Sequence, residues 1–320
     1  MEKDLTTGSV FKNVVLLSLP YLLSYFLQTL YGMADLFIIG QFEGVASTTA
    51  VSIGSQVMHM LTVMIVGLSM GTTVSVGQAV GAGNRKQAAH NIGNTVILFL
   101  VVSIALTAIL LSLVHPIVVA MSTPADAVSG TVTYLTICFI GIPFITSYNI
   151  ISSIFRGLGD SKSPMEYLIT ASIINIILDL ILVGWLRFGV GAAAFATIAS
   201  QTVSAILAFA KLMRSQEAWA VRWREVRFDG PSLKAVIVQG LPSGVQNSVI
   251  SIANVIVQSN INSFGAQAMA GCGAYSKVEG FAFLPVTCFS MALATFVSQN
   301  FGAGSGSLEI SSSIIGTCRS

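Results

Sequence analysis

The chain has 320 residues, of which 54% are hydrophobic and only 9% carry a charge. Because soluble domains carry about 25% charged residues, this composition excludes an ordinary water-soluble protein. Charge-free stretches such as 44–84 and 87–125 are long enough to cross a membrane as helices, which takes about 20 apolar residues. The segments of about ten residues with alternating hydrophobicity that build a membrane β-barrel are absent. The sequence therefore predicts an all-α polytopic membrane protein.

The apolar segments, taken in chain order, predict eight membrane-spanning helices. The first apolar segment is too long for a cleavable signal peptide, so we expect it to remain in the mature chain. Short polar or glycine-rich breaks separate the segments, among them 83–86, 156–164 and 189–191. The predicted spans are residues 14–39, 47–78, 91–114, 127–155, 165–186, 189–213, 234–261 and 268–299.

The positively charged residues gather on one side of these spans. The N-terminus and the connections after the second, fourth and sixth spans hold twelve lysines and arginines, whereas the opposite side holds Arg187 and, if the eighth span begins late, Lys277. Since positive residues are retained on the cytoplasmic side, we expect a multi-pass protein of the plasma (inner) membrane with a cytoplasmic N-terminus. The twelve residues are Lys3, Lys12, Arg85, Lys86, Arg156, Lys162, Lys211, Arg214, Arg222, Arg224, Arg227 and Lys234.

Two segments 221 positions apart have similar sequences. SMGTTVSVGQAVGAG at 69–83 matches SMALATFVSQNFGAG at 290–304 in seven of fifteen positions, and the Leu-Pro pair at 19–20 returns at 241–242. A repeat of this length indicates a duplicated fold. Aligning the first span with the seventh and the second with the eighth makes the repeat unit six helices. Because six is even, both units cross the membrane in the same direction.

The repeat predicts the domain organisation. Residues 1–214 are expected to form a six-helix N-terminal lobe, and residues 215–233 a cytoplasmic linker. Residues 234–320 then supply two helices and a stub of a second, parallel six-helix repeat. A complete duplication would need about 440 residues, twice the repeat offset. We therefore interpret the chain as C-terminally truncated.

Two carboxylates interrupt the apolar spans, Asp35 in the first and Asp179 in the fifth. A charged group within a span costs about 2.5–3.5 kcal/mol on insertion scales, so such a residue is expected to be functional. Both spans run outward and place the two carboxylates at similar depths. Asn175 lies on the same helix face as Asp179, and Thr197 reaches a similar depth in the sixth span. These groups predict a hard-oxygen site for Na⁺ or a shared proton. The alternative is that Asp35 is interfacial and Asp179 pairs with Arg187.

The remaining polar residues show no pattern of catalytic chemistry. The four cysteines lack metal-ligand spacing and are interpreted as small core residues, and the recurring Gln78 and Gln299 as helix-end packing features. Phosphate loops, zinc-protease motifs and nucleophile elbows are missing. We therefore expect neither an enzyme nor a cofactor, and an ion gradient rather than ATP as the energy source. The cysteines are Cys138, Cys272, Cys288 and Cys318.

Several segments in combination resemble the multidrug and toxic compound extrusion (MATE) transporters, in particular prokaryotic members. The resemblance covers nearly the whole chain and implies two six-helix lobes around a central cavity that exports organic cations in exchange for H⁺ or Na⁺. The similar segments are Leu19-Pro20, Ala34-Asp35 and Gly40, GLSMGTTVSVGQAVGAG at 67–83, RGLGDSKSPM at 156–165, NIILDLIL at 175–182, GVGAAAFAT at 189–197 and FLPVTCFSMALATFVSQNFGAG at 283–304.

The resemblance also implies roles for individual residues. Asp35, Asn175, Asp179 and Thr197 match the cation site of the family's N-terminal lobe, which would hold the coupling H⁺ or Na⁺. Pro20 matches a proline linked to bending of the first helix.

One departure and two alternatives bear on these expectations. Some members carry a glutamate in the seventh span where this chain has Ile250, which favours the N-terminal site. A lipid-linked oligosaccharide flippase of the same superfamily would need a cationic cavity, and the interiors of the first seven predicted spans contain no basic residue. The other alternative is a truncated remnant that does not transport. We expect small organic cations and the lipid bilayer as partners, with neither nucleic acid nor an obligate protein partner.

Overall fold

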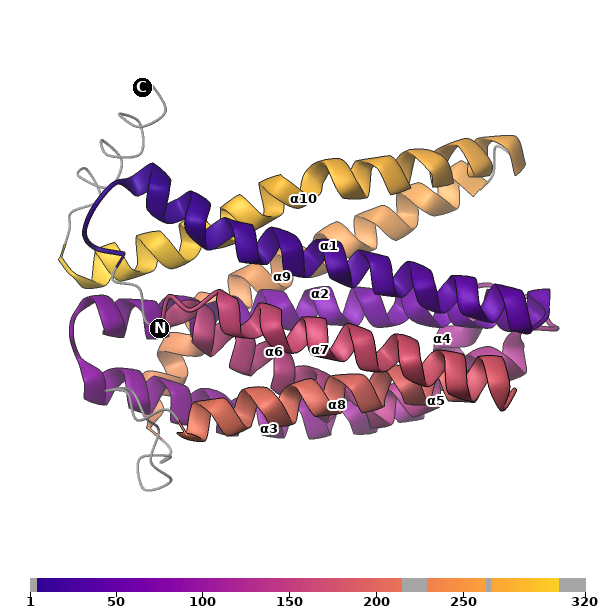
Figure 1. The fold of residues 1–320 in the computed structure, drawn as a ribbon, viewed down its shortest axis with the longest axis horizontal. Helices are drawn as coiled ribbons and strands as arrows, with labels where there is room; N and C mark the ends of the chain where they lie inside the picture. The colour runs from indigo at the N-terminus through magenta and orange to yellow at the C-terminus, as the bar shows by residue number, and fades with distance from the viewer. Residues whose placement is uncertain (1–4, 215–228, 263–265, 305–320) are drawn as a thin grey trace.

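The computed structural model describes residues 5–214, 229–262 and 266–304. They form long helices whose axes are roughly parallel or antiparallel to one another (Figure 1). No strand occurs in this part of the chain. The elements are α1 (Val10–Phe42), α2 (Val45–Gly81), α3 (Arg85–Ser112), α4 (Val114–Ala120), α5 (Val128–Ile140), α6 (Ile142–Gly157), α7 (Lys162–Asp179), the π-helix η1 (Leu180–Trp185), α8 (Val190–Arg214), α9 (Gly230–Asn262) and α10 (Ala266–Gly302).

Six helical segments in the described ranges are long and apolar enough to cross a membrane. They are α1, α2, α3, α7 with η1, α8 and the part Glu279–Gly302 of α10, and the bent pair of α5 and α6 supplies a seventh. The predicted all-α polytopic membrane fold is confirmed. The remaining predicted span corresponds to α9, which has the length but is less apolar. Two of its polar side chains bond to α2, since Gln239 Nε2 donates to Gln78 Oε1 (3.1 Å) and Asn247 Nδ2 to the Val63 carbonyl (3.4 Å).

The fourth predicted span, 127–155, is not one straight helix. α5 and α6 bend by 51° at Gly141. A Cβ at Gly141 would lie 2.4 Å from Cδ1 of Ile198, so the glycine lets α8 approach the bend. Pro143 sits in the first turn of α6, where a missing N–H removes no helical hydrogen bond. α6 also extends beyond the predicted end, so Arg156, expected in the following connection, lies in its last turn and is buried.

Two buried apolar clusters hold the first six spans together. One surrounds Leu135 and Phe139 of α5, and the other surrounds Ile92 of α3 and Ile154 of α6. Cys138 belongs to the first cluster and is a free, buried thiol, in agreement with its interpretation as a core residue.

α9 crosses α2 through glycines. A Cβ on Gly71 would lie 2.2 Å from the carbonyl oxygen of Val236, and a Cβ on Gly240 would lie 2.3 Å from that of Leu68. Small residues of this kind allow two membrane helices to bring their backbones together, where packing rather than the hydrophobic effect drives association.

The contact between α9–α10 and the first two helices is tight at one end and becomes looser toward the other. Near the C-terminal end of α10, Thr295 and Gln299 are buried, whereas Val249 of α9 and Phe283 of α10 are exposed. Figure 1 shows α9 and α10 moving away from α1 and α2 toward the end where α9 leads to α10. The two helices are therefore closed against the N-terminal lobe on the side of the basic connections and separated from it on the other side.

Residues 215–228 of the predicted linker lie outside the described residues. Directly after them, the N–H of Asp229 donates to Asn94 Oδ1 (2.8 Å), and the Asp229 carboxylate accepts the N–H of Ser232 (3.0 Å). The hydroxyl and N–H of Ser232 lower the pKa of the Asp229 carboxyl by hydrogen bonding to it. Gln87 Nε2 also donates to Ser232 Oγ (3.0 Å), so these contacts tie the beginning of α9 to α3. Also outside the described residues are the predicted stub 305–320, Lys3 and Cys318, and the side chains of Cys272 and Lys277.

Candidate ion-coupling site

Asp35 and Asp179 lie at matching depths on neighbouring helices. Asp35 is seven residues before the end of α1 at Phe42, and Asp179 is six residues before the end of η1 at Trp185. At 1.5 Å per residue, both are about 10 Å from the ends of their helices. Asn175 precedes Asp179 by one helical turn on α7. All three side chains are buried, with exposures of 7% for Asp35, 1% for Asn175 and 0% for Asp179.

Each of these three residues has buried polar atoms without a hydrogen-bond partner in the described part of the chain. The atoms are Oδ1 of Asp35, both side-chain polar atoms of Asn175 and both carboxyl oxygens of Asp179. Most buried polar atoms in proteins are hydrogen-bonded, and leaving one unpaired is unfavourable. The oxygens among these five atoms, on three residues of α1 and α7, are free to bind a proton or a cation.

The two carboxyl groups lie close enough for their charges to interact, although no hydrogen bond joins them within the described residues. Two carboxylates at this separation repel each other unless a proton or a cation lies between them. The pair, with the carbonyl oxygen of Asn175, is therefore suited to hold a proton or a hard cation such as Na⁺. Within the described ranges, no cluster of three His, Cys, Asp or Glu side chains offers a transition-metal site.

The structure does not support the alternative interpretation of the two carboxylates. Asp35 is buried rather than interfacial. Arg187 is exposed in the turn after η1, with a positive φ of 51°. No ion pair joins it to Asp179 in the described part of the chain.

Thr197 lies on α8, which packs against α7. Its hydroxyl donates to the carbonyl oxygen of Ala193 one turn earlier (3.1 Å), and it makes no hydrogen bond to the carboxylates. The structure thus brings three of the four predicted residues together and leaves Thr197 beside them on the neighbouring helix.

Two features of the site were not predicted from the sequence. Tyr134 of α5 is buried near Asp35, with its hydroxyl 3.1 Å from Ser55 Oγ. The π-helix η1 begins directly after Asp179, and π-turns of this kind often occur at functional sites. No spacing pattern identifies either feature, because a tyrosine in an apolar span reads as core and a π-turn has no sequence signature.

Pro20 is fifteen residues before Asp35 in the same helix, with its ring buried. A proline inside a helix lacks the N–H that would bond the carbonyl four residues earlier, here that of Leu16. The hydroxyl of Ser24 donates to the Pro20 carbonyl (2.7 Å). α1 therefore has a weakened position between its basic-side end and Asp35.

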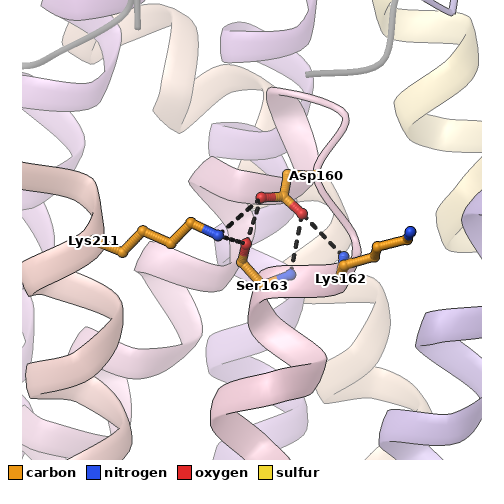
Figure 2. Close-up of polar contacts among 4 residues, drawn as sticks. All are labelled: Asp160, Lys162, Ser163 and Lys211. Atoms are coloured by element: carbon orange, nitrogen blue, oxygen red, sulfur yellow. Dashed lines mark hydrogen bonds and ion pairs between the residues drawn. The ribbon is translucent and has the colours of Figure 1, made fainter. Parts of the chain in front are cut away.

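A second polar cluster lies at the opposite end of α7. Figure 2 shows the Asp160 carboxylate accepting the backbone N–H groups of Lys162 and Ser163, both at 3.0 Å. It also forms an ion pair with Lys211 Nζ of α8 (3.8 Å). The carboxylate thereby caps the first turn of α7 and links the α6–α7 connection to α8, which is a structural role.

Comparison with known proteins supports this fold. The MatE family model matches residues 20–181 and 242–308. The "Probable multidrug resistance protein YpnP" of Bacillus subtilis is 30% identical over 307 residues, covering 94% of this chain and 67% of the relative. The "Probable multidrug resistance protein NorM" of Thermotoga maritima is 30% identical over 298 residues, with coverages of 92% and 64%. The "FAD transporter" of Shewanella oneidensis is 26% identical, with coverages of 93% and 66%.

Solved structures of similar proteins agree with the fold. A transporter of the MOP superfamily from Pyrococcus furiosus superposes with a TM-score of 0.90 at 24% identity, covering 97% of this chain and 69% of that one. The outward-facing conformation of a multidrug resistance MATE family transporter gives 0.87 at 25% identity, with coverages of 94% and 67%. The chain spans about two thirds of the length of the curated relatives that it matches. Because the family model matches more than half of its residues, the chain belongs to the MatE family of MATE transporters.

Proposed function

We propose that the chain is a cation-coupled antiporter that exports drugs and other small organic cations, and that Asp35, Asn175 and Asp179 hold the coupling ion. The observation that carries the proposal is the set of buried polar atoms without partners on these three residues. A proton or Na⁺ at this position would satisfy these atoms and offset the repulsion between the two carboxylates.

Coupling would act through α1. Asp35 and Pro20 are about 22 Å apart along this helix at 1.5 Å per residue. An ion entering from outside would draw Asp35 toward Asp179, and α1 would bend at Pro20, where one helical hydrogen bond is missing. Because α1 also packs along α10, the bend would change the space between the two halves of the molecule and displace a bound drug.

The geometry accommodates either coupling ion. Two carboxylates that share one proton suit H⁺, and the same oxygens with the Asn175 carbonyl suit Na⁺. Efflux from proteoliposomes driven by a pH gradient alone, or by a Na⁺ gradient alone, separates the two.

The names of the relatives and the charge distribution support the proposed substrates and location. Two relatives are named probable multidrug resistance proteins, which supports small organic cations as substrates and a transporter rather than an enzyme. The basic connections support a plasma-membrane location with a cytoplasmic N-terminus. We expect no cofactor beyond the coupling ion, no nucleic acid and no obligate protein partner.

Dye efflux from cells that express this chain tests the proposal. We expect Asp35→Asn to abolish efflux of a cationic dye such as rhodamine 123, because the asparagine cannot carry the coupling proton or the charge that attracts Na⁺. Asp126→Asn is the matched control, since Asp126 is an exposed acid between α4 and α5. Normal efflux by Asp35→Asn would contradict the coupling role. No efflux above the empty vector for the unmodified chain would favour the non-transporting alternative.

A further inference from the structure

Arg156 is a buried cation at the junction between the two halves of the molecule. It lies in the last turn of α6 and is 7% exposed. A buried guanidinium is strongly unfavourable unless an opposite charge or a full set of acceptors compensates it. The partners of Arg156 therefore indicate whether it is a structural or a ligand-binding residue.

The hydrogen bonds of Arg156 are incomplete. Nη2 donates to Ser153 Oγ (2.8 Å), which is itself 2.7 Å from Ser69 Oγ of α2. Nε is buried and has no acceptor within the described residues. No carboxylate in these ranges forms an ion pair with Arg156, and the nearby Asp160 caps α7 and pairs with Lys211.

Three tyrosines lie within electrostatic range of this charge. The guanidinium acts electrostatically on the hydroxyls of Tyr21, Tyr25 and Tyr148, which come from α1 and α6. The Tyr21 hydroxyl is buried and has no partner in the described chain, while the Tyr25 hydroxyl donates to Met291 Sδ of α10 (3.3 Å). Arg156 Nε and the Tyr21 hydroxyl are thus two buried donors without an acceptor within the described residues, and an anion is the ligand that such donors bind.

The cluster is sealed on the basic side of the molecule. Gln299 of α10 donates through Nε2 to the carbonyl oxygen of Gly157, the residue after Arg156 (3.0 Å). Separation of α10 from α6 at this end would break that bond and open the route to Arg156 from the side of the basic connections. The unpaired charge is therefore buried only while this end is closed.

We propose that Arg156 binds a carboxylate or phosphate group of the transported molecule when the cytoplasmic side is open. The inference rests on the proposed transport function and assigns to Arg156 the recognition of an acidic group on a transported molecule. Closure of the cytoplasmic side then removes water from the pair, with the Tyr21 hydroxyl as an additional donor. The bound molecule would then be transferred to the outer side when α1 bends at Pro20.

Binding of a matched pair of dyes to the purified chain tests this proposal. Rhodamine 110 carries a free carboxylate, and rhodamine 123 is its methyl ester. We expect the chain to bind rhodamine 110 more tightly, and Arg156→Gln to reduce the ratio of the two affinities by about tenfold, the size of effect expected for a lost hydrogen bond to a charged group. Arg156→Lys should retain part of the preference because it keeps the charge but not the fork of donors.

The controls separate this site from general effects of charge and from the proposed function. Lys162→Gln removes an exposed positive charge six residues away and should leave the affinity ratio unchanged. An unchanged ratio in Arg156→Gln, or no binding of rhodamine 110, would overturn the proposal. Failure of the proposed function would appear in a different experiment, as an absence of rhodamine 123 efflux from cells.

Discussion

Gly81 of α2 and Gly302 of α10 each pack against the backbone of the other helix, in reciprocal positions. A Cβ on Gly81 would lie 1.8 Å from the carbonyl oxygen of Gln299, and a Cβ on Gly302 would lie 2.0 Å from that of Gln78. The two copies of the repeated segment therefore meet at the basic ends of their helices, where they close the molecule. Gln78 and Gln299 contribute to packing there, as expected from the sequence.

Substitution of either glycine should open this closure. In Gly81→Ala the methyl group would clash with a backbone carbonyl oxygen, which cannot change rotamer to avoid it. Overpacking of this kind costs about 1–3 kcal/mol. We expect α2 and α10 to separate and Cys288, buried against α1, to react with N-ethylmaleimide about fivefold faster or more. Peptide-resolved mass spectrometry distinguishes Cys288 from the other cysteines.

Gly280→Ala is the control for this substitution, because nothing lies within 4 Å of a Cβ at Gly280. Its Cys288 labelling rate should equal that of the unmodified chain. Equal rates in Gly81→Ala and Gly280→Ala would show that the close approach of α2 and α10 does not keep the two helices closed at their basic ends.

Removal of the Asp160 carboxylate should destabilise the protein. Asp160→Ala loses both backbone hydrogen bonds at the start of α7, and loss of a helix cap typically costs about 1 kcal/mol. We expect the unfolding temperature in detergent to fall by about 2–4 °C. Lys211→Met should have a smaller effect, since the Lys211 side chain is 44% exposed and such ion pairs contribute little. A larger loss in Lys211→Met than in Asp160→Ala would assign the stability to the ion pair instead.

We expect the ion site to lower the stability of the protein when no coupling ion is bound. Asn175→Leu replaces two unpaired buried polar atoms by an apolar side chain of similar size, and each unpaired atom costs about 1–3 kcal/mol. In Na⁺-free buffer we expect the unfolding temperature to rise by about 2–4 °C while transport is lost. A fall in the unfolding temperature would mean that Asn175 is hydrogen-bonded in solution.

Asn91 provides the comparison for Asn175. It is equally buried, but its Nδ2 donates to the Ser75 carbonyl (3.0 Å) and its Oδ1 accepts from Gln87 Nε2 (2.9 Å). Asn91→Leu removes both hydrogen bonds and should lower the unfolding temperature. The opposite signs of the two Asn→Leu effects distinguish an ion-binding asparagine from a structural one.

Most of the fold and the centre of the candidate site could be predicted from the sequence, because both depend on strong local signals. Long apolar segments set the spans, and a carboxylate within such a segment stands out. Asp35 and Asp179 could be placed at one depth by counting residues from the ends of their helices, and the structure agrees.

The features that were missed depend on tertiary packing. The bend at Gly141 follows from the approach of Ile198 on α8, which no local pattern reports. Because Arg156 follows an apolar segment and precedes a Gly-rich connection, the sequence predicts that it lies in a loop. Its burial depends on Ser153 of its own helix and on tyrosines that include Tyr21 of α1, which are brought together only by the fold.

Ion release on drug binding tests the central claim most directly. Rhodamine 123 is added to the purified chain in weakly buffered solution, while a pH indicator and a Na⁺ electrode record the released ion. We predict release of H⁺ or Na⁺ by the unmodified chain and by Asp126→Asn, and none by Asp179→Asn. Equal release by Asp179→Asn and the unmodified chain would contradict the assignment of the coupling ion to Asp35, Asn175 and Asp179.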